Sequence, residues 1–300
     1  MELLPLNSVA EVDAEALGVG PVRAVFLAPE DPSFMLAIKL SYEKGLVSPI
    51  LIGRKQQMLE AAVKAGFDIS RQKQVHLDDL QVIANHGLNM LFNGEVDLVS
   101  KGQMSTNFVY RAVIQSEKKN GTQRLIAVTS FWEIVPLKHF VILTDPGVNI
   151  EPDVQAKIEL VKKAIAYLGL FGHREPRVLA LSASREIDRD LRSHLDVKQI
   201  REALAADGYN CSVESGGLID IFETAADKRA NILLMPHLVT GNSLVKMDFC
   251  LEVKRRGIVM TTRGPVLVPS RADSSSHLVD EISLAVAVAT RFKEGFDENL

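Results

Sequence analysis

Residues 264–289 hold the side chains of this sequence that are best suited to chemistry on an anion. An apolar stretch ends at Pro269, and Ser-Arg-Ala-Asp-Ser follows before a helical pattern begins. The hydroxyl of Ser270, the guanidinium of Arg271 and the N–H groups of a helix start could together bind phosphate. The alternative is that Asp273 or the serine after it caps the helix, while Arg271 pairs with a surface acid. These residues alone leave both interpretations open.

A second candidate lies at residues 98–106, which read LVSKGQMST and lead from a strand into a helix start. Gly102 would let the backbone approach a ligand closely, and Lys101 would supply a positive charge. Thr106 stands at the helix start, and Arg111 follows one to two turns later. The spacing does not match a phosphate-binding P-loop, because there the glycine precedes the lysine. An exposed lysine in an ordinary strand–helix loop is the alternative.

A third candidate lies at residues 235–242, which read MPHLVTGN. Pro236 would end a strand and Gly241-Asn242 would form a turn before a helix, while His237 is more typical of a structural or solvated histidine. No GxGxxG follows a strand, no GxSxG is present, and the seven histidines show no HxxxH or HExxH spacing. The sequence therefore gives no support for a nucleotide-dehydrogenase motif, a serine-hydrolase elbow or a metal site.

Alternating strand and helix patterns must position these loops. In the first half we expect helices over 32–44 and before Gly66, and strands at 22–28, 48–53, 96–99, 124–134 and 139–144. In the second half we expect helices over 154–168, stopped by Gly169, and over 278–292, with strands at 177–183, 231–236, 257–262 and 265–269. Such alternation predicts an α/β fold with a largely parallel, buried sheet. At 300 residues the chain exceeds one ordinary compact domain, so two lobes are expected.

Composition narrows the class of protein. Hydrophobic residues make up 47% and charged residues 24%, which excludes a disordered chain, and the net charge of −4 gives no basic surface for nucleic acid. The N-terminus lacks the basic region of a secretory signal, and no apolar run approaches the ~20 residues that span a bilayer. Cys211 and Cys250 match no metal or redox spacing, and we interpret both as small buried residues. We therefore expect a cytoplasmic protein without a membrane or nucleic-acid partner.

Five segments in order resemble the phosphate acetyl/butyryltransferase family, and the phosphate butyryltransferase branch more closely. They are residues 40–53 (LSYEKGLVSPILIG), 100–106 (SKGQMST), 144–157 (TDPGVNIEPDVQAK), 231–242 (NILLMPHLVTGN) and 269–274 (PSRADS). The resemblance covers nearly the whole chain. It implies a two-lobed fold like that of isocitrate and isopropylmalate dehydrogenases, with the site in the interlobe cleft. The first lobe would be discontinuous, with residues 1–145 plus 264–300, and the second would be residues 146–263.

The resemblance also implies the reaction acyl-CoA + phosphate ⇌ acyl phosphate + CoA, with a short-chain acyl group. Partners would be acyl-CoA and inorganic phosphate, no metal or other cofactor would be obligatory, and the chain would form a homodimer or higher homo-oligomer. Ser270 and Arg271 would lie at the phosphate and the developing oxyanion, and Lys101 would face them across a cleft. Asp273 and His277 are the candidates for the base. Further substrate-binding residues would be Gly102, Thr106, Arg111, Arg124, Gly241 and Asn242.

The chain departs from the family pattern in three places. After SRADS, relatives have a lysine and then Ser-Ile-Ala-Leu-Ala, where this chain has Leu278 and Glu-Ile-Ser-Leu-Ala. The family's Asp-Gly-Pro-Leu loop is replaced by residues 215–218. The family's Arg-Thr-Gly stretch, which a Ser-His follows, is replaced by residues 121–124. An alternative is therefore a catalytically impaired homologue that binds CoA or acyl phosphate as a sensor or partner subunit. A decarboxylating dehydrogenase on the same fold is a further alternative. Acyl-chain length, physiological direction and oligomer size stay open.

Overall fold

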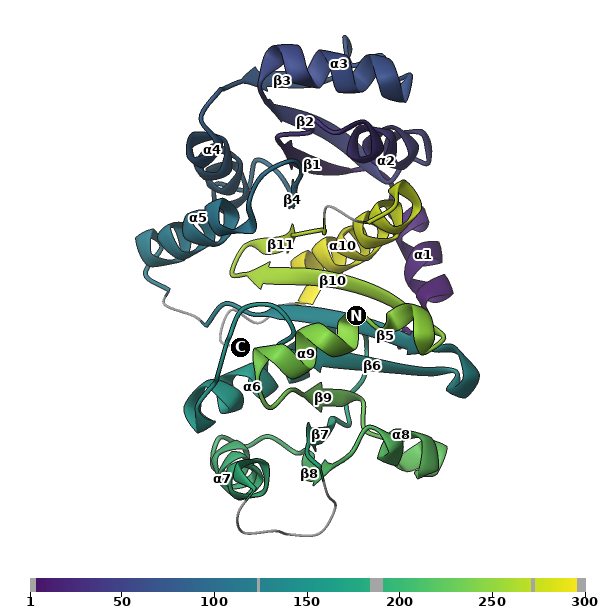
Figure 1. Ribbon diagram of the computed structural model, residues 1–300, viewed down its shortest axis with the longest axis vertical. Helices are drawn as coiled ribbons and strands as arrows, with labels where there is room; N and C mark the ends of the chain where they lie inside the picture. The colour runs from purple at the N-terminus through teal and green to yellow at the C-terminus, as the bar shows by residue number, and fades with distance from the viewer. Residues whose placement is uncertain (1–3, 123–124, 184–190, 271–272, 296–300) are drawn as a thin grey trace. The chain divides into compact units, whose positions relative to one another are not determined.

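The computed structural model describes residues 4–122, 125–183, 191–270 and 273–295. The chain folds into two compact units (Figure 1). Unit 1 comprises Met1–Val9, Ala127–Arg255 and Asp297–Leu300, and unit 2 comprises Ala10–Ile126 and Arg256–Phe296. Both units are therefore discontinuous in sequence. The division expected from the sequence, 1–145 plus 264–300 against 146–263, differs from this one at two places. Residues 127–145 belong with residues 146–255, and residues 256–263 belong with residues 10–126.

Unit 2 contains a mostly parallel sheet with strand order β3-β2-β1-β4-β11-β10. Only the β10–β11 pair in this order is antiparallel. Its strands are β1 (Val22–Leu27), β2 (Val47–Gly53), β3 (Lys73–His76), β4 (Leu98–Lys101), β10 (Val253–Thr261, from Arg256 on) and β11 (Gly264–Leu267). Its helices are α1 (Val9–Gly18), α2 (Pro32–Glu43), α3 (Lys55–Ala65), α4 (Leu80–Phe92), α5 (Thr106–Lys119) and α10 (Ser275–Gly295).

The helices of unit 2 form two groups. α2 packs against α3 and α10, whereas α4 packs against α5, and Figure 1 shows the two groups on opposite sides of the strands. This covering explains the apolar residues of the two central strands, of which Val25 and Phe26 in β1 and Leu98 and Val99 in β4 are fully buried. The strand order reverses between β1 and β4, because β2 and β3 lie on one side of β1 and β4 on the other. Ligands of open α/β sheets bind at such a reversal, beyond the carboxyl ends of the strands.

Unit 1 contains a second series of strands in the order β5-β6-β9-β7-β8. All neighbours are parallel except β5 and β6. Its strands are β5 (Val128–Ile134), β6 (His139–Thr144), β7 (Arg177–Leu181), β8 (Ser212–Gly216) and β9 (Ile232–Leu234). Its helices are α6 (Val154–Leu170), α7 (Arg192–Ala206), α8 (Ile219–Glu223) and α9 (Leu238–Val245), with short 3-10 turns at Val135–Leu137, Ala226–Lys228 and Asp248–Cys250.

The predicted α/β class with a largely parallel sheet is confirmed, and most predicted elements match within a few residues. α6 continues through Gly169, so that glycine does not stop the helix. β3 and β8 were missed because each is short and half-polar, as outer strands often are. Cys250 is exposed and Cys211 only half-buried, so the interpretation of both as buried residues was wrong. No helix in the described ranges is long and apolar enough to cross a membrane.

Candidate functional site

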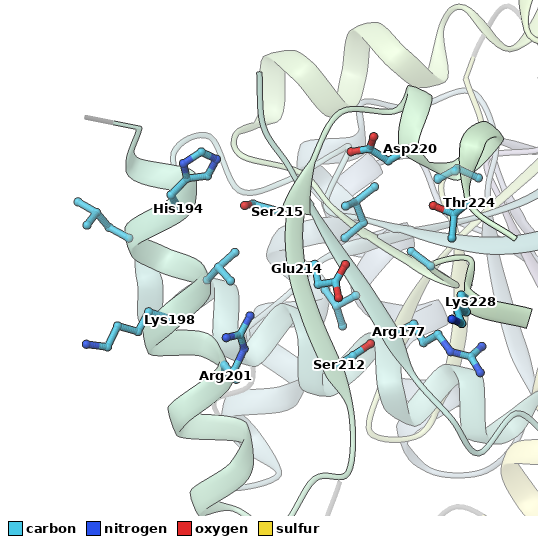
Figure 2. A pocket seen from close by; sticks show the side chains of 16 residues that line it. Arg177, His194, Lys198, Arg201, Ser212, Glu214, Ser215, Asp220, Thr224 and Lys228 are labelled. Carbon is cyan, nitrogen blue, oxygen red and sulfur yellow. The ribbon is translucent and has the colours of Figure 1, made fainter. Parts of the chain in front are cut away.

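A pocket of about 620 Å³ lies in unit 1, around the outer strand β8 (Figure 2). Apolar side chains such as Val178 and Ile221 share its lining with basic side chains from α7 and from the turn at Lys228. One of these, Arg201, donates a hydrogen bond to the carbonyl of Val213, which neighbours the pocket, so its guanidinium is partly engaged in the fold. No residue predicted to act in the site lines this pocket, and we place the candidate site elsewhere.

The candidate site lies in unit 2, at the strand reversal between β1 and β4. The N–H groups of Gly102 and Gln103 donate to the carbonyls of Leu27 and Ala28, at N···O distances of 2.7 and 2.8 Å. A Cβ atom added to Gly102 would lie 2.5 Å from the Ala28 oxygen and 2.7 Å from the Leu27 oxygen. Because both neighbours are backbone, only glycine allows the two strand ends to meet this closely.

A small pocket of about 30 Å³ opens at this junction. It brings together four of the predicted site residues, Lys101, Gly102, Ser270 and Asp273. The remaining lining residues are Asp31, Phe34, Gln103, Pro269 and Leu278. Lys101 and Ser270, which the sequence predicts to face one another, line the same pocket of unit 2. They are close because β4 and β11 are neighbouring strands, paired through Leu267 and Ser100.

The pocket lining carries one buried cation, Lys101, and two carboxylates, Asp31 and Asp273, and three helices begin in this part of unit 2. Lys101 is 3% exposed, and its Nζ donates to the carbonyl of Met104 at 3.4 Å, so the interpretation as an exposed loop lysine was wrong. Helix α2 begins after Asp31, α5 after Ser105, and α10 at Ser275. The N–H ends of helices attract anions, and the Ser275 hydroxyl donates to the Ser33 carbonyl at 2.9 Å, which ties two of these helix starts together.

Hydrogen bonds in the turn between Ser270 and α10 show which residue caps this helix. The Ser274 hydroxyl accepts a hydrogen bond from the N–H of His277 at 3.2 Å, so Ser274 caps the helix. Asp273 does not cap it; its Oδ2 accepts the N–H of Ser270 at 2.6 Å. Arg271, the predicted phosphate ligand, lies outside the described residues.

His277 has an acidic neighbour that the sequence analysis did not single out. The Nε2 atom of His277 lies 3.6 Å from Oε1 of Glu281, whose side chain is 5% exposed. Together with Asp273 these residues place ligand atoms within 4.8 Å of one another, as a metal site would require. The proximity of His277 and Glu281 could have been predicted from their i, i+4 spacing on a predicted helix, because such residues share one helix face.

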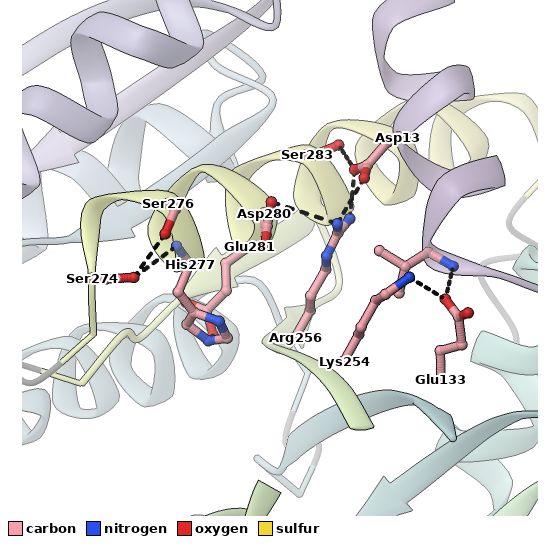
Figure 3. Close-up of polar contacts among 11 residues, drawn as sticks. Asp13, Glu133, Lys254, Arg256, Ser274, Ser276, His277, Asp280, Glu281 and Ser283 are labelled. Atoms are coloured by element: carbon pink, nitrogen blue, oxygen red, sulfur yellow. Dashed lines mark hydrogen bonds and ion pairs between the residues drawn. The ribbon is translucent and has the colours of Figure 1, made fainter. Parts of the chain in front are cut away.

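The opposite flank of α10 is anchored by charged groups (Figure 3). The Arg256 guanidinium is 3% exposed, donates to both carboxylate oxygens of Asp13 at 2.7 and 2.8 Å, and lies 3.7 Å from Asp280. Ser283 donates to Asp13 at 2.6 Å. Burial alone would raise the pKa of Asp13, but the hydrogen bonds from Arg256 and Ser283 hold that pKa below its ordinary value. This network joins α1, β10 and α10, and so fixes the helix that carries His277.

Other predicted residues do not join the pocket. Thr106 begins α5, and Arg111 is exposed on that helix. Arg124 lies outside the described residues. Gly241 and Asn242 belong to unit 1, and the expectation that they form a turn was wrong because both lie inside α9.

Gly241 allows α9 to pack on the loop after β6. A Cβ atom at Gly241 would lie 2.8 Å from the Cα of Pro146, and Asn242 Nδ2 donates to the Pro146 carbonyl at 3.4 Å. The neighbouring Asp145 holds this loop, since its carboxylate accepts backbone N–H groups from residues 128, 147, 148 and 149. Burial nevertheless raises the pKa of Asp145. Asp145 was not singled out from the sequence, where it was read only as part of the TDPGVN segment.

Comparison with known proteins gives a consistent result. A family model described as Phosphate acetyl/butaryl transferase matches residues 64–215. The chain is 26% identical over 279 residues to a phosphate butyryltransferase of Clostridium acetobutylicum, covering 89% of this chain and 92% of that protein. It is also 26% identical over 293 residues to a phosphate acetyltransferase of Rhizobium meliloti, covering 93% and 92%.

Solved structures show the same fold. A branched-chain phosphotransacylase from Enterococcus faecalis superposes with a TM-score of 0.75 at 19% identity, over 89% of this chain and 99% of that chain. A 4-hydroxythreonine-4-phosphate dehydrogenase from Klebsiella pneumoniae superposes with a TM-score of 0.58 at 11% identity, over 90% and 99%. The fold predicted from the five segments is therefore confirmed.

Proposed function

The chain belongs to the phosphate acetyl/butyryltransferase family, and we propose that it transfers a short-chain acyl group between coenzyme A and inorganic phosphate. The observation that carries this proposal is the pocket at the ends of β1, β4 and β11, which Lys101 and Ser270 line together. A buried cation beside helix starts suits phosphate, one of the two substrates.

The residues of the pocket have separable tasks in this proposal. Lys101 and the helix starts hold phosphate, while Gly102 keeps the two strand ends close enough to form the pocket. Ser270 and Arg271 stabilise the oxyanion that develops when phosphate attacks the thioester carbonyl. Holding both reactants in place supplies the other large part of the rate enhancement. Asp273 or His277 exchanges the proton of the CoA thiol.

We further propose that the protein works in the cytoplasm as a homo-oligomer and needs no metal ion. The cytoplasmic proposal rests on its substrates, which are intracellular metabolites, and on its two unpaired cysteines. Light scattering after size-exclusion chromatography measures the oligomer. Exhaustive treatment with EDTA tests whether the activity needs a metal ion, and we expect the activity to be unchanged.

The decisive experiment is thiol release from acetyl-, propionyl-, butyryl- and branched acyl-CoAs, with and without phosphate. Cys250 is exposed and would react with a thiol reagent, so Cys250→Ser is the background control. We expect phosphate-dependent release, lowered at least ~100-fold by Arg271→Ala. Lys101→Met should chiefly raise the KM for phosphate. Binding of CoA by calorimetry without release from any of these thioesters would overturn the proposal in favour of a binding protein.

A further inference from the structure

We propose that Glu30 and Arg54 are positioning residues, which hold the turn after β1 against the phosphate pocket and thereby set the affinity for phosphate. This inference rests on the proposed function, because that function assigns phosphate to the pocket that Lys101 and Ser270 line. Glu30 directly precedes Asp31, which lines the same pocket, and Arg54 directly follows β2.

The pair consists of a buried carboxylate held by an arginine. The side chain of Glu30 is 3% exposed and that of Arg54 is 36% exposed. Glu30 accepts the backbone N–H of Arg54 at 3.0 Å and the Nε–H group at 3.0 and 3.1 Å, and Nη2 of Arg54 forms an ion pair with it. Charge-assisted bonds from several donors of one arginine fix a geometry as well as stabilise it. The pair therefore fastens the turn after β1 to the start of α3.

The turn that this pair holds has a strained backbone. Ala28 has a φ of +45°, in the left-handed region that residues with a Cβ atom rarely adopt. Such residues persist where the surrounding contacts over-determine them, and they cluster at functional sites. The Ala28 N–H donates to the Ile52 carbonyl in β2 at 2.7 Å, and the Ala28 carbonyl accepts the N–H groups of Glu30 and Gln103, both at 2.8 Å. Ala28 therefore joins the ends of β1, β2 and β4.

The same turn reaches both sides of the pocket. On the side of β4, Gln103 lines the pocket and donates to the turn. On the other side, Asp31 accepts the N–H groups of Ser33 and Phe34 at 2.9 and 3.0 Å, and both Asp31 and Phe34 line the pocket. The Ser33 carbonyl accepts the hydroxyl of Ser275 at 2.9 Å, which links the start of α2 to the start of α10. Release of the turn would therefore displace both walls of the pocket.

A second pair of the same kind lies at the opposite edge of this sheet and supplies the control. Arg23, near the start of β1, donates to Asp97 through its backbone N–H at 2.8 Å and through Nη2 at 2.7 Å. The Asp97 side chain is 5% exposed and directly precedes β4. Because β1 and β4 are parallel, this pair joins their amino ends, whereas the pocket lies at their carboxyl ends.

The test compares Arg54→Gln and Glu30→Gln with Arg23→Gln in the whole protein. Calorimetry measures the Kd for inorganic phosphate without turnover, and thiol release from acyl-CoA measures kcat and the KM for each substrate. We expect Arg54→Gln and Glu30→Gln to raise the Kd and the KM for phosphate about 10-fold, because the displaced walls misplace the bound anion. The KM for acyl-CoA should be unchanged, and kcat should change less than the KM for phosphate. Arg54→Lys should lie between Arg54→Gln and the wild type, because lysine keeps the charge and loses the planar fork.

Arg23→Gln should leave the phosphate affinity unchanged. An equal loss of affinity in this control would refute the inference, because a general loosening of the sheet would then explain the result. Unchanged phosphate affinity in folded Arg54→Gln and Glu30→Gln would refute it as well. If Arg54→Gln does not fold, Glu30→Gln and Arg54→Lys decide the outcome.

The calorimetry also separates this inference from the proposed function. If the wild type binds phosphate but releases no thiol from any acyl-CoA, the proposed function fails, and the phosphate affinities of the variants still decide the roles of Glu30 and Arg54. A wild type that does not bind phosphate would overturn the inference.

Discussion

Substitution of Gly102 by alanine tests the close approach on which the candidate site depends. The added Cβ would lie 2.5 Å from the Ala28 oxygen and 2.7 Å from the Leu27 oxygen, far inside the separations that real Cβ atoms show. Neither neighbour can rotate away, because both are backbone carbonyls at the end of β1. The chain must therefore separate the ends of β1 and β4.

The magnitude follows from two terms. Overpacking of a tight site costs typically 1–3 kcal/mol. Separation also weakens two hydrogen bonds, from the N–H groups of Gly102 and Gln103 at 2.7 and 2.8 Å, each contributing about 1 kcal/mol. If about half of each hydrogen bond is lost, the two terms together lower the free energy of unfolding of Gly102→Ala by about 2–4 kcal/mol. The KM for phosphate should rise at least ~10-fold, because Lys101 moves with the strand end.

Urea unfolding followed by far-ultraviolet circular dichroism measures the stability. The matched control is Gly18→Ala in the same unit, where a Cβ would have no atom within 4 Å. Fluorescence of Trp132, which belongs to unit 1, reports on the other unit. If Gly102→Ala unfolds at the same urea concentration as Gly18→Ala and keeps its KM for phosphate, the reasoning about this junction is refuted.

Three further predictions concern stability. Gly241→Ala should lower the free energy of unfolding by about 1–3 kcal/mol, because its Cβ would lie 2.8 Å from the Pro146 Cα; an unfolding midpoint equal to wild type would contradict this. Gly169→Ala should raise the free energy of unfolding by about 0.5–1 kcal/mol, since this glycine lies inside α6 with open space around it. A lower Tm in calorimetry would contradict the prediction that alanine favours the helix at this position. Burial would raise the pKa of Asp97, but hydrogen bonds from Arg23 and Lys293 hold that pKa below its ordinary value. The stabilisation by ionised Asp97 is therefore present above the ordinary pKa of an aspartate and is lost as the pH falls through the lowered one. In Asp97→Asn the free energy of unfolding, measured with urea from pH 5 to pH 2, should therefore fall less steeply as the pH is lowered. An unchanged pH dependence would exclude this role of Asp97.

Strands and helices could be predicted from the sequence where the order of apolar and polar residues reflects which side chains are buried. β1 and α2 match because an apolar run and an Asp-Pro helix start carry their own signals. β3 and β8 carry no such signal, since outer strands of a sheet bury only part of their side chains. The prediction that Gly169 ends the helix was wrong, because a glycine within a helix cannot be told from one that ends a helix by the sequence.

The α/β class, the family resemblance and the loops that carry Lys101 and Ser270 could be predicted from the sequence. Local chemistry suffices there, because helix caps, apolar runs and short motifs act over a few residues. That these two residues share a pocket could be seen only in the folded chain, since the pairing of β4 with β11 joins segments more than 160 positions apart. The tertiary structure also decided that Ser274 caps α10, that Asp273 holds the Ser270 turn, and that a buried Glu281 lies beside His277. Burial and strand order depend on the packing of the whole unit, and no local spacing records them.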